Sequence, residues 1–336
     1  MSNHHETCRA IREAQSILLT THREGDGDGI GSQVALYTAL KKLGKTVRMM
    51  NVDLPAPRYH FVKGVEKIEV FNPAVKILKP DLVIVFDTND LRYFEPFSSH
   101  LVKMGARIVF IDHHPHSAPI RPAASSFNSA SVIDTKAAST GEITFDIIKG
   151  LGVSLDPVIA GALYTSIVFD TQLFRFIRGS KKSHVIAAEI LEFVNDPEQI
   201  HVELFGRQTP NKMKLLSEVL SSVDYTHGDR VAWIKVKLSQ LNEHQLDTEA
   251  SRDIVDMIMA IDSISVAVLI REDAPEEFKI SLRSKVDFEV LPIAETLGGG
   301  GHRQAAGAYF SGPYDDLRAL ITETLSESFN EERPAV

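Results

Sequence analysis

Three short apolar runs in the first third of the chain end abruptly in acidic or histidine residues. Residues 16–21 lead into a loop that starts at His22, residues 82–86 are followed by Asp87, and residues 107–111 are followed by Asp112. Continuous apolar runs of this length are typical of parallel strands that are buried on both faces. The carboxyl ends of parallel strands lie at one edge of the sheet, where open α/β sheets place their sites. The pattern therefore predicts an α/β fold with polar side chains gathered at that edge.

Helix signals follow the strands. Residues 139–142 match a capping box, which predicts a helix from there to Gly150. Asp156 followed by Pro157 has the pattern of an N-cap before a proline at the first helical position. The helix that they begin delivers Asp170 at its far end.

The length of 336 residues is sufficient for two domains, each with its own core. From Val223 onward the pattern changes to strand pairs, of which the first turns at Gly228 and Asp229. We expect an N-terminal domain over residues 1–221, with a parallel sheet and helices on both faces. A smaller α+β domain with an antiparallel or mixed sheet is expected over residues 222–336.

Composition restricts the partners of the chain. With 36 basic and 45 acidic residues, its net charge of −9 argues against binding of long duplex nucleic acid, which requires a broad basic face. Short or mononucleotide ligands remain compatible with it. The single cysteine, Cys8, excludes an internal disulfide and fits the reducing cytoplasm. Because no apolar run approaches the ~20 residues of a bilayer span, we expect no membrane partner.

The acids and imidazoles at the strand ends form a candidate metal centre. Its members are His22, Asp26, Asp28, Asp87, His113 and Asp170. Four carboxylates in one place would repel one another, and two divalent ions balance their charge. Two ions roughly 3.5–4 Å apart can hold a bridging hydroxide that attacks phosphorus. Taken alone, the loop at residues 22–28 equally suits an Asp-Gly turn beside a surface histidine. A glycosidase, with two carboxylates as acid and nucleophile, explains neither the histidines nor the number of acids.

The order of these motifs resembles the DHH phosphoesterase superfamily. The motifs are H-x-x-x-D-x-D at residues 22–28, D-T-x-D at 87–90, D-H-H at 112–114 and the later Asp170. The glycine-rich residues 298–307 are similar to the signature of the family's C-terminal associated domain. The resemblance spans nearly the whole chain and is greatest to the nano-RNase and pAp-phosphatase branch (NrnA-like).

The resemblance implies roles for the residues of the metal centre. One Mn²⁺ would be held by His22 and Asp26, and Asp87 would bridge it to a second Mn²⁺. The second ion would be held by Asp28, His113 and Asp170. Mg²⁺ and Co²⁺ are the expected substitutes for Mn²⁺.

Further roles follow from the same resemblance. Asp112 would orient His113, and His114 would face the substrate phosphate or the leaving oxygen, so that Asp87, Asp112 and His114 form the catalytic set. The resemblance also implies a cleft between the domains. The residues expected to bind substrate there are Arg283, Ser284, Gly299, Gly300, Gly301 and His302. Successive glycine N–H groups can form an anion nest.

The expected activity is hydrolysis of short single-stranded RNA, including linear dinucleotides such as pGpG or pApA, and of 3′-phosphoadenosine 5′-phosphate (pAp). The alternative enzyme is a cyclic-dinucleotide phosphodiesterase of the stand-alone DHH type, and the alternative without catalysis is a nucleotide-binding regulator. A family II inorganic pyrophosphatase would lack the glycine-rich loop, and a RecJ-type exonuclease would carry additional domains. A homodimer is the default expectation for the assembly.

Three features depart from the family pattern, of which the first is Gly25, where the family usually has proline. Gln172 stands where the family has glycine, and residues 178–183 are more basic than the family's usual turn. Exposure to solvent is the favoured interpretation of this basic segment. None of these departures changes a proposed metal ligand.

Overall fold

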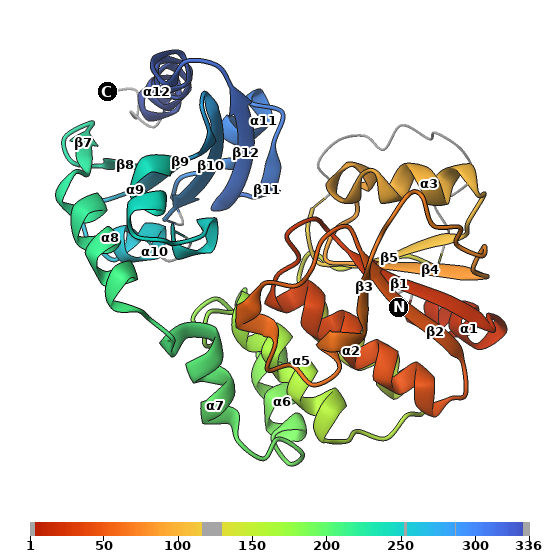
Figure 1. Cartoon of the computed structure of the whole chain (residues 1–336). Coiled ribbons are helices and arrows are strands. Elements are labelled where there is room, and N and C mark those ends of the chain that lie inside the picture. Colours follow the sequence, from red (N-terminus) through yellow and green to blue (C-terminus); the bar gives the residue numbers. More distant parts are fainter. Residues whose placement is uncertain (1–3, 116–129, 252–253, 286, 332–336) are drawn as a thin grey trace. The chain divides into compact units, whose positions relative to one another are not determined.

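A computed structural model describes residues 4–115, 130–251, 254–285 and 287–331 of the chain (Figure 1). The chain forms two compact units, Met1–Arg207 and Gln208–Val336. This division lies before the boundary that the sequence placed at residue 221. Helix α8 (Pro210–Ser221) belongs to the second unit because its Leu215 and Val219 pack into the core of that unit.

The first unit contains a six-stranded sheet in the order β3-β2-β1-β4-β5-β6, and every pair in it is parallel. The strands are β1 (Ser16–Thr21), β2 (Thr46–Asn51), β3 (Ile68–Val70), β4 (Leu82–Phe86), β5 (Ile108–Asp112) and β6 (Val132–Ile133). Every residue of β4 and β5 is buried, as their continuous apolar sequence predicts.

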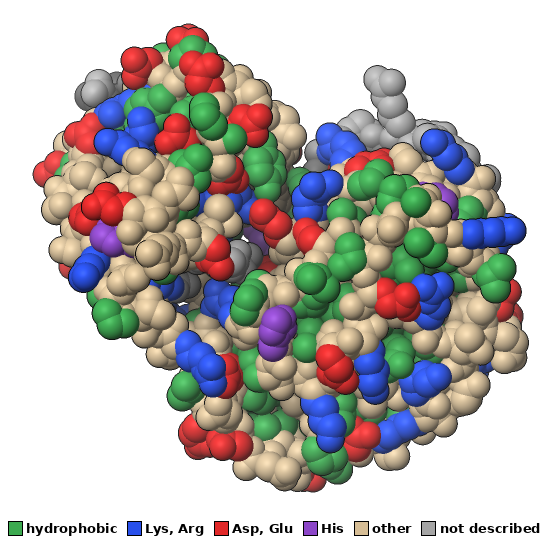
Figure 2. All heavy atoms as spheres, in the orientation of Figure 1, with side chains coloured by type: hydrophobic (Ala, Val, Ile, Leu, Met, Phe, Trp, Pro, Cys, Tyr) green, Lys and Arg blue, Asp and Glu red, His purple; other side chains and the backbone are tan. Residues whose placement is uncertain are grey.

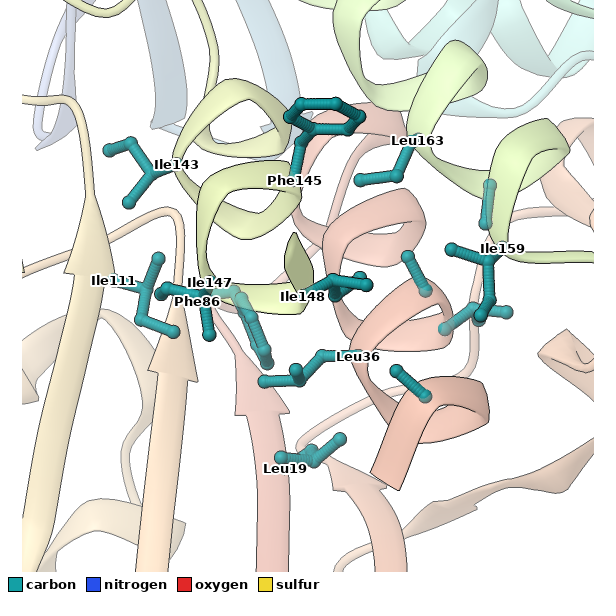
Figure 3. Close-up of a cluster of buried hydrophobic side chains, with 14 of the residues drawn as sticks. Leu19, Leu36, Phe86, Ile111, Ile143, Phe145, Ile147, Ile148, Ile159 and Leu163 are labelled. Carbon is teal, nitrogen blue, oxygen red and sulfur yellow. The ribbon is translucent and has the colours of Figure 1, made fainter. Parts of the chain in front are cut away.

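Helices cover both faces of this sheet. The helices of the first unit are α1 (His4–Glu13), α2 (Gly27–Lys42), α3 (Phe97–Lys103), α4 (Thr140–Gly150), α5 (Pro157–Asp170), α6 (Lys182–Ile190) and α7 (Pro197–His201). On one face, Leu36 of α2 and Ile143 of α4 join Leu19 and Ile111 of the strands in a buried cluster (Figure 3). On the other face, Phe97 of α3 packs with the opposite side chains of the same strands. Helix α4 begins as the capping box predicts, with Ser139 as its N-cap.

The strand order reverses between β1 and β4. From β1 the chain proceeds outward through β2 and β3, and then returns to β4 on the other side of β1. The connections that leave these two strands therefore diverge, and ligands of open α/β sheets bind in the crevice that such a divergence creates. His22 directly follows β1 and Asp87 directly follows β4.

The second unit contains a mixed sheet in the order β11-β12-β10-β9-β8-β7. Only the β8–β9 pair is parallel among the described residues. The strands are β7 (Asp224–Thr226), β8 (Val231–Val236), β9 (Val266–Ala274), β10 (Glu277–Ser284), β11 (Gly300–His302) and β12 (Ala305–Ser311). The helices besides α8 are α9 (Leu238–Glu243), α10 (Ile254–Met259), α11 (Leu291–Thr296) and α12 (Tyr314–Glu331). The predicted fold class of a parallel α/β domain followed by a smaller α+β domain is confirmed.

The surface agrees with the mixed charge of the sequence. On the face shown in Figure 2, lysine and arginine side chains are interspersed with aspartate and glutamate. Within the described part of the chain, no helix combines the length and apolar character that a membrane crossing requires.

Candidate metal centre

The first three residues of the centre lie between the end of β1 and the first turn of α2. Asp26 is the N-cap of α2, and its Oδ1 accepts a hydrogen bond from the backbone N–H of Asp28 at 3.0 Å. This cap fixes the start of the helix and places Asp28 in its first turn. Ligand atoms of His22, Asp26 and Asp87 all lie within 4.8 Å of one another.

Asp28 is fully buried at the N-terminus of a second helix, α4. Its carboxylate accepts hydrogen bonds from the backbone N–H groups of Thr140 at 2.7 Å and Gly141 at 3.1 Å. The hydroxyl of Ser166 on α5 donates to the same carboxylate. The partial positive charge of a helix N-terminus stabilises a carboxylate placed there. Three helices, α2, α4 and α5, therefore hold Asp28 in one orientation.

Asp87 lies between two groups of candidate ligands. Its Oδ2 is 3.4 Å from His22 Nε2, and its Oδ1 is 3.6 Å from His113 Nε2. It belongs both to the group with His22 and Asp26 and to a group with Asp28 and His113. Its φ of 59° lies in the left-handed region, which aspartate tolerates better than most residues. This backbone turn directs the carboxylate toward both groups at once.

Three carboxylates surround the ring nitrogen Nε2 of His113. The distances from Nε2 are 3.6 Å to Asp28 Oδ2, 3.6 Å to Asp87 Oδ1 and 3.4 Å to Asp170 Oδ2. These separations exceed ordinary hydrogen-bond lengths of about 2.7–3.2 Å. Ligands of a small divalent ion lie about 2.1 Å from it and therefore roughly 3 Å from one another. The spacing and the mixed N/O donor set fit a divalent cation.

Burial makes this arrangement costly in the absence of cations. It raises the pKa of Asp28 and of Asp87, and the neighbouring carboxylates raise both further. Burial and the nearby cationic groups lower the pKa of His113 well below its usual value, so its imidazole is held in the neutral form that binds metals. Divalent cations would neutralise the carboxylates, and the residues at hand fit them.

A second network orients His114. The Oδ1 of Asp112 accepts from the ring Nδ1 of His114 at 2.8 Å and from the backbone N–H of His113 at 2.8 Å. Burial opposes a charge on His114, but the carboxylate of Asp112, together with those of Asp170 and Asp28, outweighs the effect of burial and raises the pKa of His114 to about 9. Asn89, which sequence reasoning missed, donates from Nδ2 to the other oxygen of Asp112 at 2.6 Å and to the carbonyl of His114 at 3.0 Å.

The second unit places its predicted residues on or next to two strands, β10 and β11, which both pair with β12. Arg283 at the end of β10 is opposite Ala305 of β12, which in turn is opposite His302 of β11. The hydroxyl of Ser284 donates to the backbone carbonyl of Phe288 at 2.6 Å. The glycine-rich stretch differs from the expected loop with an anion nest, because Gly300–His302 is a strand hydrogen-bonded to β12. A Cβ on Gly299 would overlap the backbone of β12, which explains the need for glycine there.

Comparison with known proteins gives the family. A model of the DHH family, N-terminal domain, matches residues 16–167, and a model of the DHHA1 domain matches residues 231–331. The bifunctional oligoribonuclease and PAP phosphatase NrnA of Thermus thermophilus is 32% identical over 317 residues, which are 93% of this chain and 91% of that protein. The chain belongs to the DHH family. The predictions of this family and of a hydrolase acting on phosphoester bonds are confirmed.

Solved structures share the DHH-family fold. An exopolyphosphatase-related protein from Bacteroides fragilis has a TM-score of 0.85 and 22% identity, with 97% of this chain and 96% of that chain covered. RecJ from Thermus thermophilus in complex with Mn²⁺ has a TM-score of 0.59 and 14% identity, with 97% of this chain and 55% of that chain covered. At these identities the likeness establishes the fold alone.

The basic segment at residues 178–183, which departs from the DHH-family pattern, contacts the rest of the first unit through Arg178. Arg178 donates from Nη1 to the carbonyl oxygens of Thr135 at 2.9 Å and His113 at 3.3 Å. Arg178 is exposed, as expected, and in addition it contacts the backbone of two other segments of the first unit. The local sequence could not predict these two hydrogen bonds, because it does not distinguish an arginine that only faces solvent from one that donates to distant backbone carbonyls.

Gln172 is the first of three consecutive residues in the left-handed region, with a φ of 46°. A side chain costs about 1–2 kcal/mol in this region, and glycine avoids that cost. We expect Gln172→Gly to raise the free energy of unfolding by about 1 kcal/mol, measured by urea denaturation. Gln15, which is exposed and outside this region, is the matched control. Gln15→Gly should be destabilising, and a loss of stability in both variants would contradict the strain at Gln172.

Removal of metal should make the stability of the enzyme depend on pH. In the metal-free protein, folding raises the pKa of Asp28 and of Asp87. Their contribution to the free energy of unfolding is therefore complete below the ordinary carboxylate pKa of about 4, and it is lost as the pH rises through the raised pKa values of the folded state. In EDTA, we expect the Tm of the wild type to fall more steeply with rising pH than that of Asp28→Asn, which lacks the ionisable group. Mn²⁺ should restore the wild-type Tm. If Tm changed with pH in the same way in the wild type and in Asp28→Asn, ionisation of Asp28 would not limit the stability of the metal-free protein.

Proposed function

We propose that the chain is a phosphodiesterase that hydrolyses short single-stranded oligoribonucleotides and linear dinucleotides, and that it also dephosphorylates pAp. The observation that carries this proposal is the position of Asp87 between two groups of N/O ligands at the switch point of the sheet. The names of the NrnA relatives support the choice of substrates.

Two divalent ions, Mn²⁺ in the first instance, would be held by six residues of the first unit. These are His22, Asp26, Asp28, Asp87, His113 and Asp170. When bound, such ions supply hydroxide near neutral pH and stabilise charge on the phosphoryl oxygens.

The side chains of the centre divide the remaining work. His114 would donate a proton to the leaving oxygen. Asp112 keeps the ring of His114 in place through the 2.8 Å bond to Nδ1. Arg283 of β10 and His302 of β11, which both flank β12 in the second unit, would bind a substrate phosphate, for which the guanidinium of arginine is well suited.

A panel of substrates tests the proposal. The full chain with Mn²⁺ is incubated with pAp, a linear dinucleotide, a pentanucleotide and a cyclic dinucleotide, and products are separated by chromatography. We expect mononucleotides from the linear dinucleotide and the pentanucleotide, adenosine monophosphate from pAp, and none of these reactions in EDTA. Hydrolysis of the cyclic dinucleotide alone would instead support the cyclic-dinucleotide phosphodiesterase. Binding without turnover would support a regulator that lacks catalysis.

A further inference from the structure

One face of the sheet in the second unit is covered by helices over only part of its width. Along β10, Phe278, Ile280 and Leu282 are buried on the face that packs against α11 and α12. Side chains alternate along a strand, so Lys279 and Arg283 lie on the other face, where they are half-buried.

Exposure of this second face increases across the sheet toward β12. On β9, Leu269 and Arg271 are 4% and 7% exposed, and Leu269 lies in the core formed with α8, α9 and α10. Their partners on β10, Ser281 and Lys279, are half-buried. On β12 the residue opposite Lys279 is Tyr309, which is 60% exposed. The helical cover therefore ends before it reaches this tyrosine.

Lys279 and Tyr309 form a pair at one end of this face. The ammonium nitrogen of Lys279 lies 5.6 Å from the centre of the Tyr309 ring, a cation–π distance. Arg283 lies four residues further along β10, about 13 Å away at the usual rise per residue. Between them the face carries only small side chains, because Ser281 is opposite Gly307 and Arg283 is opposite Ala305. The result is a flat strip with a cation near each end and an exposed aromatic ring at one.

Such a strip has the features of a surface for single-stranded nucleic acid, which combines cations along the backbone with aromatic rings on which bases stack. An apolar partner is a poorer match, because the face presents two cations and a serine beside a single aromatic ring. We infer that Tyr309 stacks a base of an RNA substrate and that Lys279 binds the adjoining phosphate. They form a nucleotide subsite beyond the phosphate-binding Arg283. This inference rests on the proposed function and adds to it a preference for substrates longer than two nucleotides.

Kinetics with substrates of different length test the subsite. In the full chain with Mn²⁺, Tyr309→Ala should raise the ratio of KM for a pentanucleotide to KM for a linear dinucleotide about ten-fold, the effect of losing one stacked base. Tyr309→Phe keeps the ring and should keep the ratio. Tyr225, on the opposite edge strand β7, is 41% exposed and is the matched control, so Tyr225→Ala should also leave the ratio unchanged. Lys279→Gln should reduce the salt dependence of pentanucleotide binding.

Binding without turnover separates the subsite from the proposed activity. Fluorescence anisotropy of a labelled pentanucleotide with the full chain in EDTA should show weaker binding to Tyr309→Ala than to Tyr309→Phe, whether or not the wild type hydrolyses RNA. Absence of turnover in the wild type would overturn the proposed function but leave this comparison intact. Equal binding by both variants would overturn the subsite. A change in mass by light scattering in Tyr309→Ala alone would also overturn it, since the face would then join copies of the chain.

Discussion

Asp87→Ala should abolish phosphodiesterase activity and Mn²⁺ binding together. Asp87 is the residue that reaches both His22 and His113, so its loss removes a ligand from both groups at once. The substitution would also reduce the negative charge with which Asp28 and the other acids attract a cation. Activity is measured on a linear dinucleotide, and Mn²⁺ binding by isothermal titration calorimetry. Retained turnover would contradict the bridging position of Asp87.

Two further variants make this result specific. Because alanine is strained at the φ of 59° that Asp87 adopts, Asp87→Asn removes the charge in a residue that tolerates this region. It should show the same loss of metal and activity. Asp81 precedes β4 at the opposite end from Asp87 and accepts hydrogen bonds from the backbone N–H groups of Gln15 and Ser16. Asp81→Asn should keep both metal and activity.

Gly31→Ala should destabilise the first unit by about 1–3 kcal/mol, the range expected when an atom is forced into a packed core. A Cβ at Gly31 would overlap the carbonyl oxygen of Ala162 and would lie 2.9 Å from Cβ of Ser166, both on α5. Helices α2 and α5 would have to separate. Because Ser166 donates to the carboxylate of Asp28, Mn²⁺ affinity should fall as well. Stability is measured by urea denaturation and affinity by calorimetry.

Gly161 provides the matched control for Gly31→Ala. It lies within α5, and a Cβ there meets no atom within 4 Å. Gly161→Ala should therefore stabilise the protein by about 0.5–1 kcal/mol, since alanine loses less backbone freedom than glycine on folding. If both variants changed stability in the same direction, close packing of α2 on α5 would not explain the effect of Gly31→Ala.

The sequence predicted those parts of the molecule that local patterns determine. Continuous apolar runs predicted β4 and β5, and Ser139 with Glu142 predicted the start of α4. Because parallel strands end at one edge, these local assignments also predicted that His22, Asp87 and His113 would lie close together, as they do.

Contacts between distant segments were not predictable in the same way. Ser166 reaches Asp28 from the interior of α5, and nothing in its neighbouring sequence distinguishes it from a serine that packs in a core. Asn89 follows a strand end in a polar segment, where an amide that binds Asp112 resembles an ordinary turn residue. The glycine-rich Gly300–His302 appeared to be a loop because glycine is rare in strands, and its pairing depends on the close approach of β12.

The dispersal of the cluster along the chain has a consequence for protein synthesis. Its members follow β1, follow β4, follow β5 and end α5, so Asp170 is the last of them to leave the ribosome. A nascent chain that stops short of Asp170 lacks one carboxylate of the set. The proposed metal centre would therefore be completed late in the assembly of the first unit, and a product truncated before Asp170 would lack one of its ligands.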